Sequence, residues 1–157
     1  MAGNFWLVKS EASCFSIDDL ANQKNKTTFW DGVRNYRARN ILRDEMKNGD
    51  KVLFYHSNAT PPGAAGVCEI VKEGYPDFTA FDPDNEHYDP KSKKDSPSWF
   101  MVDVKLVKKF KREVSLPEIK ENKKLQKMLL LQPVNRLSVM PVTKEEFEEI
   151  VKLGDKS

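Results

Sequence analysis

The chain has 157 residues, of which 39% are hydrophobic and 32% are charged, which is enough apolar material for one core under a well-solvated surface. These values exclude a largely disordered chain, and we expect a single domain over residues 1–157 with its core at about 5–153. The net charge of only +2 excludes a protein that coats nucleic acid with a general positive field, so any nucleic-acid surface must be a local patch.

The first predicted elements are a strand and a short helix. The apolar run at 5–8 indicates a buried strand, which turns polar in the sequence KSE at 9–11. Ser16 and Asp19 have the spacing of a capping box, in which each residue satisfies a backbone amide of the other. This spacing predicts that a helix begins directly after Ser16.

A second helix is predicted from Tyr36, because apolar residues recur at helical intervals as far as Met46. The sequence Asn-Gly-Asp at 48–50 is a typical helix end. The stretch WDGVRNYRARN (30–40) is therefore expected to be a loop that leads into this helix. Gly32 permits a tight backbone turn there, and the first amides of the helix point outward as hydrogen-bond donors.

The remaining strands are predicted at 51–56, 65–73, 99–110 and 136–140. In the segment 99–110 apolar and polar residues alternate, which indicates one buried face and one solvated face. Thr143 and Glu146 form a second capping box, for a helix that runs to Leu153 and ends at Gly154. These elements predict an α+β fold with a barrel-like sheet of mostly antiparallel strands.

A long loop is predicted at 76–98, where Pro, Asp, Ser and Lys dominate. Loops of this length are often lids or binding loops, although a surface insertion fits the same composition. Within the loop, His87 and Tyr88 are candidates for contact with a ligand.

The sequence gives no sign of a metal, a cofactor or a membrane. Cys14 and Cys68 lack the spacing of a zinc site or a disulfide framework, and His56 and His87 add no metal-ligand pattern. No apolar segment approaches the roughly 20 residues that a membrane helix needs. We therefore expect a soluble protein of a reducing compartment, the cytoplasm in a bacterium or the nucleus in a eukaryote.

Polar and aromatic residues gather at three element ends, namely KSE at 9–11, WDGVRNY at 30–36 and FYHSN at 54–58. Three such clusters can converge on one pocket, and we expect a concave site that contains residues of both the second and the third cluster. The alternative is that Trp30 and Tyr36 are core residues, that Asp31 is a cap, and that Arg39 and Arg43, one helical turn apart, form a solvated stripe.

These motifs, together with PPGAAGV (61–67), YPDFTAFDP (75–83), HYDPKS (87–92) and RLSVMPVT (136–143), resemble the EVE domain family over most of the chain. The resemblance implies a PUA-like fold, which is a curved β-barrel of about five or six mostly antiparallel strands with flanking helices, related to YTH and ASCH domains. It further implies a noncatalytic pocket for a modified base, namely a methylated or hydroxymethylated cytosine in DNA. Protein partners are not indicated.

The pocket residues that the resemblance implies come from the same three element ends. They are Lys9, Ser10, Glu11, Trp30, Val33, Arg34, Asn35, Tyr36, Tyr55, His56 and Ser57. Ala12 departs from the family, which usually has proline after the glutamate, and this questions the rigidity of the KSE turn. A second departure, Pro-Val-Asn at 133–135, precedes the last strand.

The chemistry of these side chains suits a reader of a flipped base. Trp30 or Tyr55 would stack on the base and recover roughly 1 to 3 kcal/mol of the few that flipping costs. Asn35 and Ser57 would bind the Watson–Crick edge, and Val33 would contact the methyl group. The residues expected to contact phosphates or to form the surrounding basic patch are Lys9, Arg34, Arg37, Arg39, Arg43 and Lys47.

Three other functions fit parts of the same sequence. A PUA-like module that binds RNA would use the same residues. A hydrolase would need His56 as a general base beside Ser57 or Cys14, but neighbouring strand residues point to opposite faces and no carboxylate is apparent that would orient the histidine. We therefore expect no enzyme. A module that binds an acidic protein partner is neither supported nor excluded.

Overall fold

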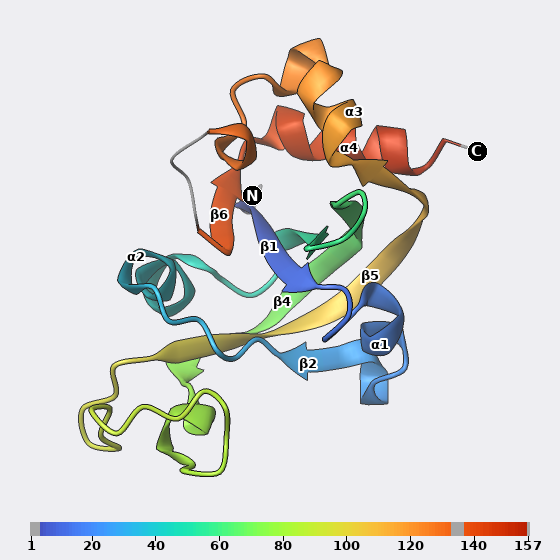
Figure 1. The fold of residues 1–157 in the computed structure, drawn as a ribbon. Helices are drawn as coiled ribbons and strands as arrows, with labels where there is room; N and C mark the ends of the chain where they lie inside the picture. The colour runs from blue at the N-terminus through green and yellow to red at the C-terminus, as the bar shows by residue number, and fades with distance from the viewer. Residues whose placement is uncertain (1–3, 133–136, 157) are drawn as a thin grey trace.

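The computed structural model describes residues 4–132 and 137–156, and within them six strands form one sheet (Figure 1). The strands are β1 (Phe5–Glu11), β2 (Thr27–Phe29), β3 (Lys51–Ser57), β4 (Gly63–Pro76), β5 (Phe100–Ser115) and β6 (Val139–Val142). The α-helices are α1 (Ile17–Ala21), α2 (Tyr36–Asn40), α3 (Leu116–Glu121) and α4 (Lys144–Gly154). A π-helix, η2 (Ile41–Glu45), continues α2, and the 3-10 turns are η1 (Lys24–Lys26), η3 (Phe78–Phe81), η4 (Lys123–Leu125) and η5 (Leu129–Leu131).

The sheet is mixed, with its strands in the order β2, β5, β4, β3, β1, β6. β1 and β3 run parallel, from Phe5 beside Lys51 to Glu11 beside Ser57, and the other neighbours are antiparallel. The predicted α+β class with mostly antiparallel strands is therefore confirmed. In the described residues the edge strands β2 and β6 do not pair with each other, so the sheet is open and the expected closure into a barrel is not seen.

The two faces of the sheet carry separate cores, because successive strand residues point to opposite sides. On one face Trp6, Val8 and Phe54 pack with residues of α1, the loop that follows β2, α2 and η2. On the other face Leu7 and Tyr55 pack with residues of α3, η4 and α4. Figure 1 shows α3 and α4 together at one end of the molecule, with the 76–98 segment at the opposite end.

Both predicted capping boxes are present. The Ser16 hydroxyl accepts a hydrogen bond from the Asp19 amide at 3.1 Å, and the Asp19 carboxylate accepts one from the Ser16 amide at 2.8 Å. Thr143 and Glu146 make the same reciprocal pair at 3.1 and 2.9 Å. α1 and α4 therefore begin where the spacing predicted.

One strand, β2, and one α-helix, α3, were not predicted. β2 has three residues and is fixed by its pairing with β5, and α3 is capped by Ser115, whose hydroxyl accepts from the Glu118 amide at 3.3 Å. β6 begins at Val139 instead of 136, and both position 136 and the Pro-Val-Asn departure at 133–135 lie outside the described residues. None of the described helices is long and apolar enough to cross a membrane.

Candidate functional site

A cavity of about 640 Å³ lies where the end of β1, the connection from β2 to α2 and the 76–98 loop meet. This volume is within the range of roughly 300–1,000 Å³ that is typical of small-ligand sites. The lining residues are Lys9, Ser10, Glu11, Cys14, Phe15, Thr28, Phe29, Trp30, Asp31, Gly32, Val33, Arg34, Glu86, His87 and Ser138. The first predicted cluster, 9–11, and residues 30–34 of the second, 30–36, therefore line one cavity.

The turn after β1 forms one wall and is held by several hydrogen bonds. The Ser10 hydroxyl donates to the Phe15 carbonyl at 2.6 Å, and the Phe15 amide donates back to the Glu11 carbonyl at 2.8 Å. The Glu11 carboxylate accepts from the Asn58 side-chain amide at 3.0 Å. These contacts fix the turn although Ala12 replaces the proline that its sequence pattern usually has.

Trp30 forms the inner wall of the cavity. Its amide donates to the Val102 carbonyl at 2.7 Å, and its ring meets Phe54 edge-on at 5.5 Å between centroids. Only 8% of Trp30 is exposed, and Val33 beside it is 5% exposed. Trp30 is therefore a core residue with one edge of its surface on the cavity, so the two alternatives for it are not exclusive.

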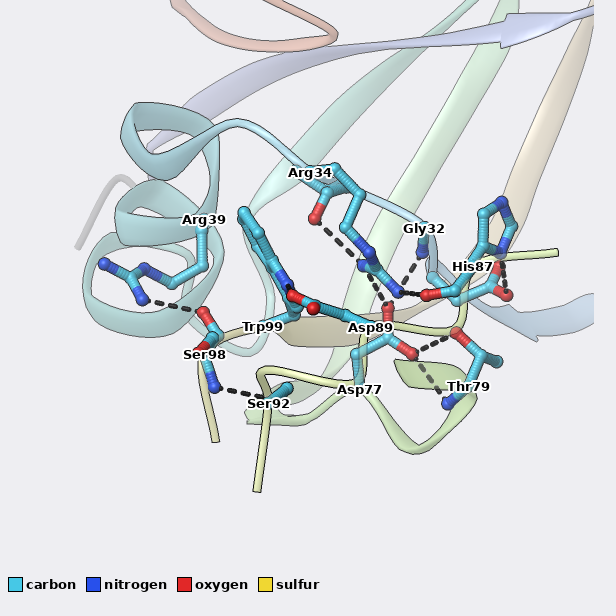
Figure 2. Close-up of polar contacts among 12 residues, drawn as sticks. Gly32, Arg34, Arg39, Asp77, Thr79, His87, Asp89, Ser92, Ser98 and Trp99 are labelled. Carbon is cyan, nitrogen blue, oxygen red and sulfur yellow. Dashed lines mark hydrogen bonds and ion pairs between the residues drawn. The ribbon is translucent and has the colours of Figure 1, made fainter. Parts of the chain in front are cut away.

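Asp77 connects the 30–34 loop to the long 76–98 loop (Figure 2). One carboxylate oxygen accepts from the Gly32 amide at 2.9 Å and from Arg34 Nη1 at 3.0 Å. The other accepts from the Thr79 amide at 2.9 Å. Burial by itself would raise the pKa of Asp77, but the hydrogen bonds from Thr79, Gly32 and Arg34 outweigh it, and the pKa lies below its ordinary value.

His87 closes the cavity over Gly32. A Cβ on Gly32 would stand 2.6 Å from Cε1 of the histidine ring, and Gly32 has a φ of 78°, so only glycine fits this close approach. The His87 carbonyl accepts from Arg34 Nη2 at 2.6 Å. Its Nδ1 lies 3.3 Å from Asp31 Oδ2, without the geometry of a hydrogen bond. His87 was expected near a ligand and lines the cavity, whereas Tyr88 is absent from its lining.

An aromatic stack fixes the far end of the long loop. Trp99 stacks on Tyr36 at 4.8 Å with an interplanar angle of 20°, and the guanidinium carbon of Arg34 lies 5.3 Å from the Trp99 ring centroid. The Trp99 indole donates to Asp89 at 2.6 Å, and this hydrogen bond lowers the pKa of Asp89. The 76–98 loop is thus anchored at 77, 87 and 89 and by the adjoining Trp99, and it forms a fixed wall.

Lys9 is a cation of the cavity lining whose side chain has no polar partner among the described residues. Its ammonium makes no hydrogen bond or ion pair with residues 4–132 or 137–156, although its backbone amide donates to the Ser138 carbonyl at 2.8 Å. Partial burial lowers the pKa of Lys9 from its ordinary 10.5. Glu11, Asp31 and Glu86 are lining residues of the same cavity, so a cation and three acidic residues lie around it.

A family model for the EVE domain matches residues 4–153. The chain belongs to the EVE domain family. It is 47% identical to human thymocyte nuclear protein 1, over 96% of this chain and 74% of that protein. The crystal structure of human THYN1 in complex with DNA that contains 5-methylcytosine superposes with a TM-score of 0.91, at 46% identity, and covers 99% of both chains.

A more distant likeness concerns the fold of the EVE domain alone. A YTH domain from Zygosaccharomyces rouxii, in complex with N6-methyladenosine RNA, matches with a TM-score of 0.57 at 16% identity and covers 99% of this chain and 86% of that one. In the part of the EVE chain that the structure describes, no group of three His, Cys, Asp or Glu residues is placed to hold a metal ion.

The third cluster of EVE motif residues does not line this cavity, so its part in a binding site stays a prediction. His56 is 6% exposed, its Nε2 accepts from the Ile17 amide at 3.0 Å, and its Nδ1 lies 3.3 Å from Glu113. Tyr55 belongs to the core on the opposite face of the sheet from Trp30, and burial raises its pKa to about 12. Ser57 is also absent from the lining. A strand directs consecutive side chains to alternate faces, so FYHSN cannot face one pocket as a unit.

Asn35 and Tyr36 of the EVE motif lie outside the cavity as well. Asn35 is the N-cap of α2, where its side-chain oxygen accepts from the Ala38 amide at 3.0 Å. Tyr36 is 61% exposed and stacks on Trp99. Both residues support the start of α2, and neither lines the base-sized cavity.

The predicted phosphate-binding arginines differ in how far they are already engaged. Arg34 is bound to Asp77, Arg39 donates to the Ser98 carbonyl at 2.7 Å, and Arg43 makes two hydrogen bonds of 2.8 Å to Asp44. Arg37 is exposed and has no ion pair or side-chain hydrogen bond within the described part of the chain. Arg37 is therefore the most available of the predicted phosphate-binding arginines.

Several lining residues were not predicted. They are Cys14, Phe15, Thr28, Phe29, Asp31, Gly32, Glu86 and Ser138. Phe29 is the largest of these with substantial exposure, at 42%. The run of polar and aromatic residues TTFWDG contained a signal for it, since Phe29 directly precedes Trp30 in a short edge strand.

Proposed function

We propose that this EVE domain is a noncatalytic module that binds a modified cytosine of DNA in the cavity between β1, the 30–34 loop and His87. The observation that carries the ligand class is the 46% identity, over 99% of both chains, to human THYN1 in complex with 5-methylcytosine DNA. The cavity volume of about 640 Å³ and its mixed polar and aromatic lining support the location.

The lining of the cavity suits the edge of a cytosine. The exocyclic amino group of cytosine donates hydrogen bonds, which the carboxylates of Glu11 or Asp31 are suited to accept. Its ring nitrogen and carbonyl accept, and the unengaged ammonium of Lys9 is the matching donor. Val33 supplies apolar surface for a group on the 5-position. A base must leave the stack to reach these groups. It remains in the cavity only if its contacts there offset the free-energy cost of unstacking and unpairing.

The hydrolase and RNA-binding alternatives have less support than binding of a modified cytosine. A hydrolase based on His56 lacks an available base, because Nε2 of His56 already accepts a backbone hydrogen bond and the ring lies outside the cavity. The RNA-binding alternative rests on the fold shared with the YTH domain, and at 16% identity that likeness gives no indication of which nucleic acid this chain binds. We further propose that the chain forms one domain. We also propose that it acts where the DNA is, which is the nucleus in a eukaryote or the cytoplasm in a bacterium.

The test of this function is a fluorescence titration of matched duplexes that carry cytosine, 5-methylcytosine or 5-hydroxymethylcytosine at one position, with a methylated RNA as a further arm. Burial of one methyl group contributes about 0.8 kcal/mol, so we expect about fourfold tighter binding of the methylated duplex. Equal affinity for the methylated and plain duplexes would contradict the proposal, and a preference for the RNA would replace it with the RNA-binding alternative.

The salt dependence separates the available arginine from an engaged one. Arg37→Ala should weaken methylated and plain duplexes equally and reduce the slope of log K against log salt by about one unit, as loss of one phosphate contact does. Arg43→Ala is the matched control and should change the slope less, because Asp44 already neutralises that guanidinium. Titrations of both variants at several salt concentrations measure this. A larger slope change in Arg43→Ala would show that the phosphate path runs over η2 instead.

A further inference from the structure

Two exposed phenylalanines lie at the rim of the cavity. Phe29, which also lines the cavity, is 42% exposed, and Phe78 is 50% exposed. Their ring centroids are 4.9 Å apart and the rings meet at 64°. Exposed aromatic side chains that lie together next to a cavity mark an interaction surface, since isolated exposure is common but paired exposure leaves a contiguous apolar patch in water.

Both rings project from backbone that is rigidly held. Phe29 is in β2, opposite Asp103 of β5, and the next residue, Trp30, is hydrogen-bonded to Val102. Phe78 directly follows Asp77, whose buried carboxylate accepts hydrogen bonds from Gly32, Arg34 and Thr79. The pair therefore comes from two segments that are locked together, and little side-chain order has to be gained on binding.

We propose that Phe29, supported edge-on by Phe78, is a wedge that enters a DNA duplex and stacks on the bases beside the one that occupies the cavity. This inference rests on the proposed function, because it supplies the step by which a paired base becomes accessible. A base that leaves its strand opens a gap of about two base steps, each about 3.4 Å along the strand, between its neighbours. Apolar side chains of other proteins fill such gaps in DNA.

The geometry assigns different roles to the two rings. Because they meet at 64°, both cannot lie parallel to the bases in one gap. Phe29 lines the cavity, so its ring lies next to the flipped base and is the one that enters. Phe78 does not line the cavity and acts by positioning Phe29, as edge-to-face aromatic pairs do.

The wedge matters for a duplex more than for a single strand. In a duplex the complementary strand holds the flanking base pairs apart, so the gap stays open unless a ring fills it. In a single strand the flanking bases are free to move onto each other and restore their own stacking. The partner of this surface is therefore double-stranded DNA at a modified cytosine.

The experiment compares Phe29→Ala and Phe78→Ala with Val107→Ala, a control that removes an exposed apolar side chain (49% exposed) of β5 that does not line the cavity. Each protein is titrated with a methylated duplex, its plain counterpart and the methylated single strand. Loss of one base-stacking contact should weaken duplex binding by Phe29→Ala about tenfold, and by Phe78→Ala about threefold, with single-strand binding changed less than about twofold. Val107→Ala should match the wild-type protein on all three.

The other outcomes exclude the wedge, the modified-base function or both. Equal losses on duplex and single strand, or no loss on either, would exclude the wedge while leaving the proposed function intact. A wild-type protein that binds the methylated and plain duplexes equally, yet loses duplex affinity in Phe29→Ala, would exclude the modified-base function and retain the wedge. Absence of duplex binding by the wild-type protein would exclude both. Thermal melting of all variants confirms that they are folded.

Discussion

Asp77→Ala is expected to lower the free energy of unfolding by about 3 to 5 kcal/mol, the usual cost of removing one partner of a buried ion pair. The Asp77 carboxylate is fully buried, and it satisfies the Gly32 amide, the Thr79 amide and Arg34 together. Without it, the guanidinium of Arg34 stays partly buried with no carboxylate next to it. Chemical denaturation followed by the intrinsic tryptophan fluorescence measures the change.

The matched control for this prediction is Asp84→Ala, which removes an exposed aspartate from the same loop. Surface substitutions of this kind change stability by no more than about 0.5 kcal/mol. Asp77→Ala should also expose the 76–98 loop to proteases, because Asp77 is its link to the 30–34 loop. If Asp77→Ala melts like Asp84→Ala and its loop stays protected, the carboxylate is not what holds the two loops together.

The same carboxylate gives stability a defined dependence on pH. The pKa of Asp77 in the folded protein is below its ordinary 3.8, so folding favours the ionised form. Its contribution is therefore complete above the unfolded pKa and is lost as the pH falls through the lower folded pKa. The difference in stability between the wild-type protein and Asp77→Ala should be constant near neutral pH and should narrow only below about pH 4.

Features set by neighbouring residues were predictable from the sequence. The capping boxes at Ser16 and Thr143 depend on residues three positions apart, and their spacing predicted where α1 and α4 begin. The clusters at 9–11 and 30–36 were expected to meet because both lie at element ends, and residues 9–11 and 30–34 line one cavity. These predictions depend only on capping interactions between residues close in sequence and on polar residues at the ends of strands.

Features set by distant residues were not predictable. Asp77 lies 43 positions from Arg34 in the chain, and nothing in the composition of the long loop distinguishes this buried aspartate from the exposed ones. The absence of FYHSN from the cavity lining has a different cause. Phe54 packs against Trp30 on one face of the sheet, so the next residue, Tyr55, packs in the core on the opposite face. The sequence gives this alternation, but it does not say which face of the sheet Phe54 is on.

Lys9→Met is expected to weaken binding of the methylated duplex roughly tenfold to hundredfold, since a hydrogen bond from a charged donor contributes about 1.5 to 3 kcal/mol. Lys9 is one of the residues that line the cavity, and its ammonium has no ion pair or hydrogen bond within the described residues, so we propose it as the donor to a bound base. Methionine keeps the length and apolar stem of the side chain and removes the charge.

The stability of Lys9→Met should be unchanged or slightly higher, in contrast to its affinity. Burial lowers the pKa of Lys9 below its ordinary 10.5, which means that folding disfavours the charged form and that its removal relieves this cost. By the same sign, the wild-type protein should lose the Lys9 part of its affinity as the pH rises through that lowered pKa. The methionine variant should show no such loss.

Lys127→Met is the matched control, because Lys127 is exposed between η4 and η5 on the side of the molecule that α3 and α4 cover. It removes the same charge from the protein but not from the cavity, so its effect on affinity measures the general electrostatic contribution alone. Duplex titrations of the wild-type protein and both variants at one salt concentration distinguish a direct contact of Lys9 with the base from a general electrostatic effect. If Lys127→Met weakens binding as much as Lys9→Met, Lys9 acts as part of the overall charge and does not contact the base; if only Lys9→Met weakens it, the cavity is where the cytosine binds.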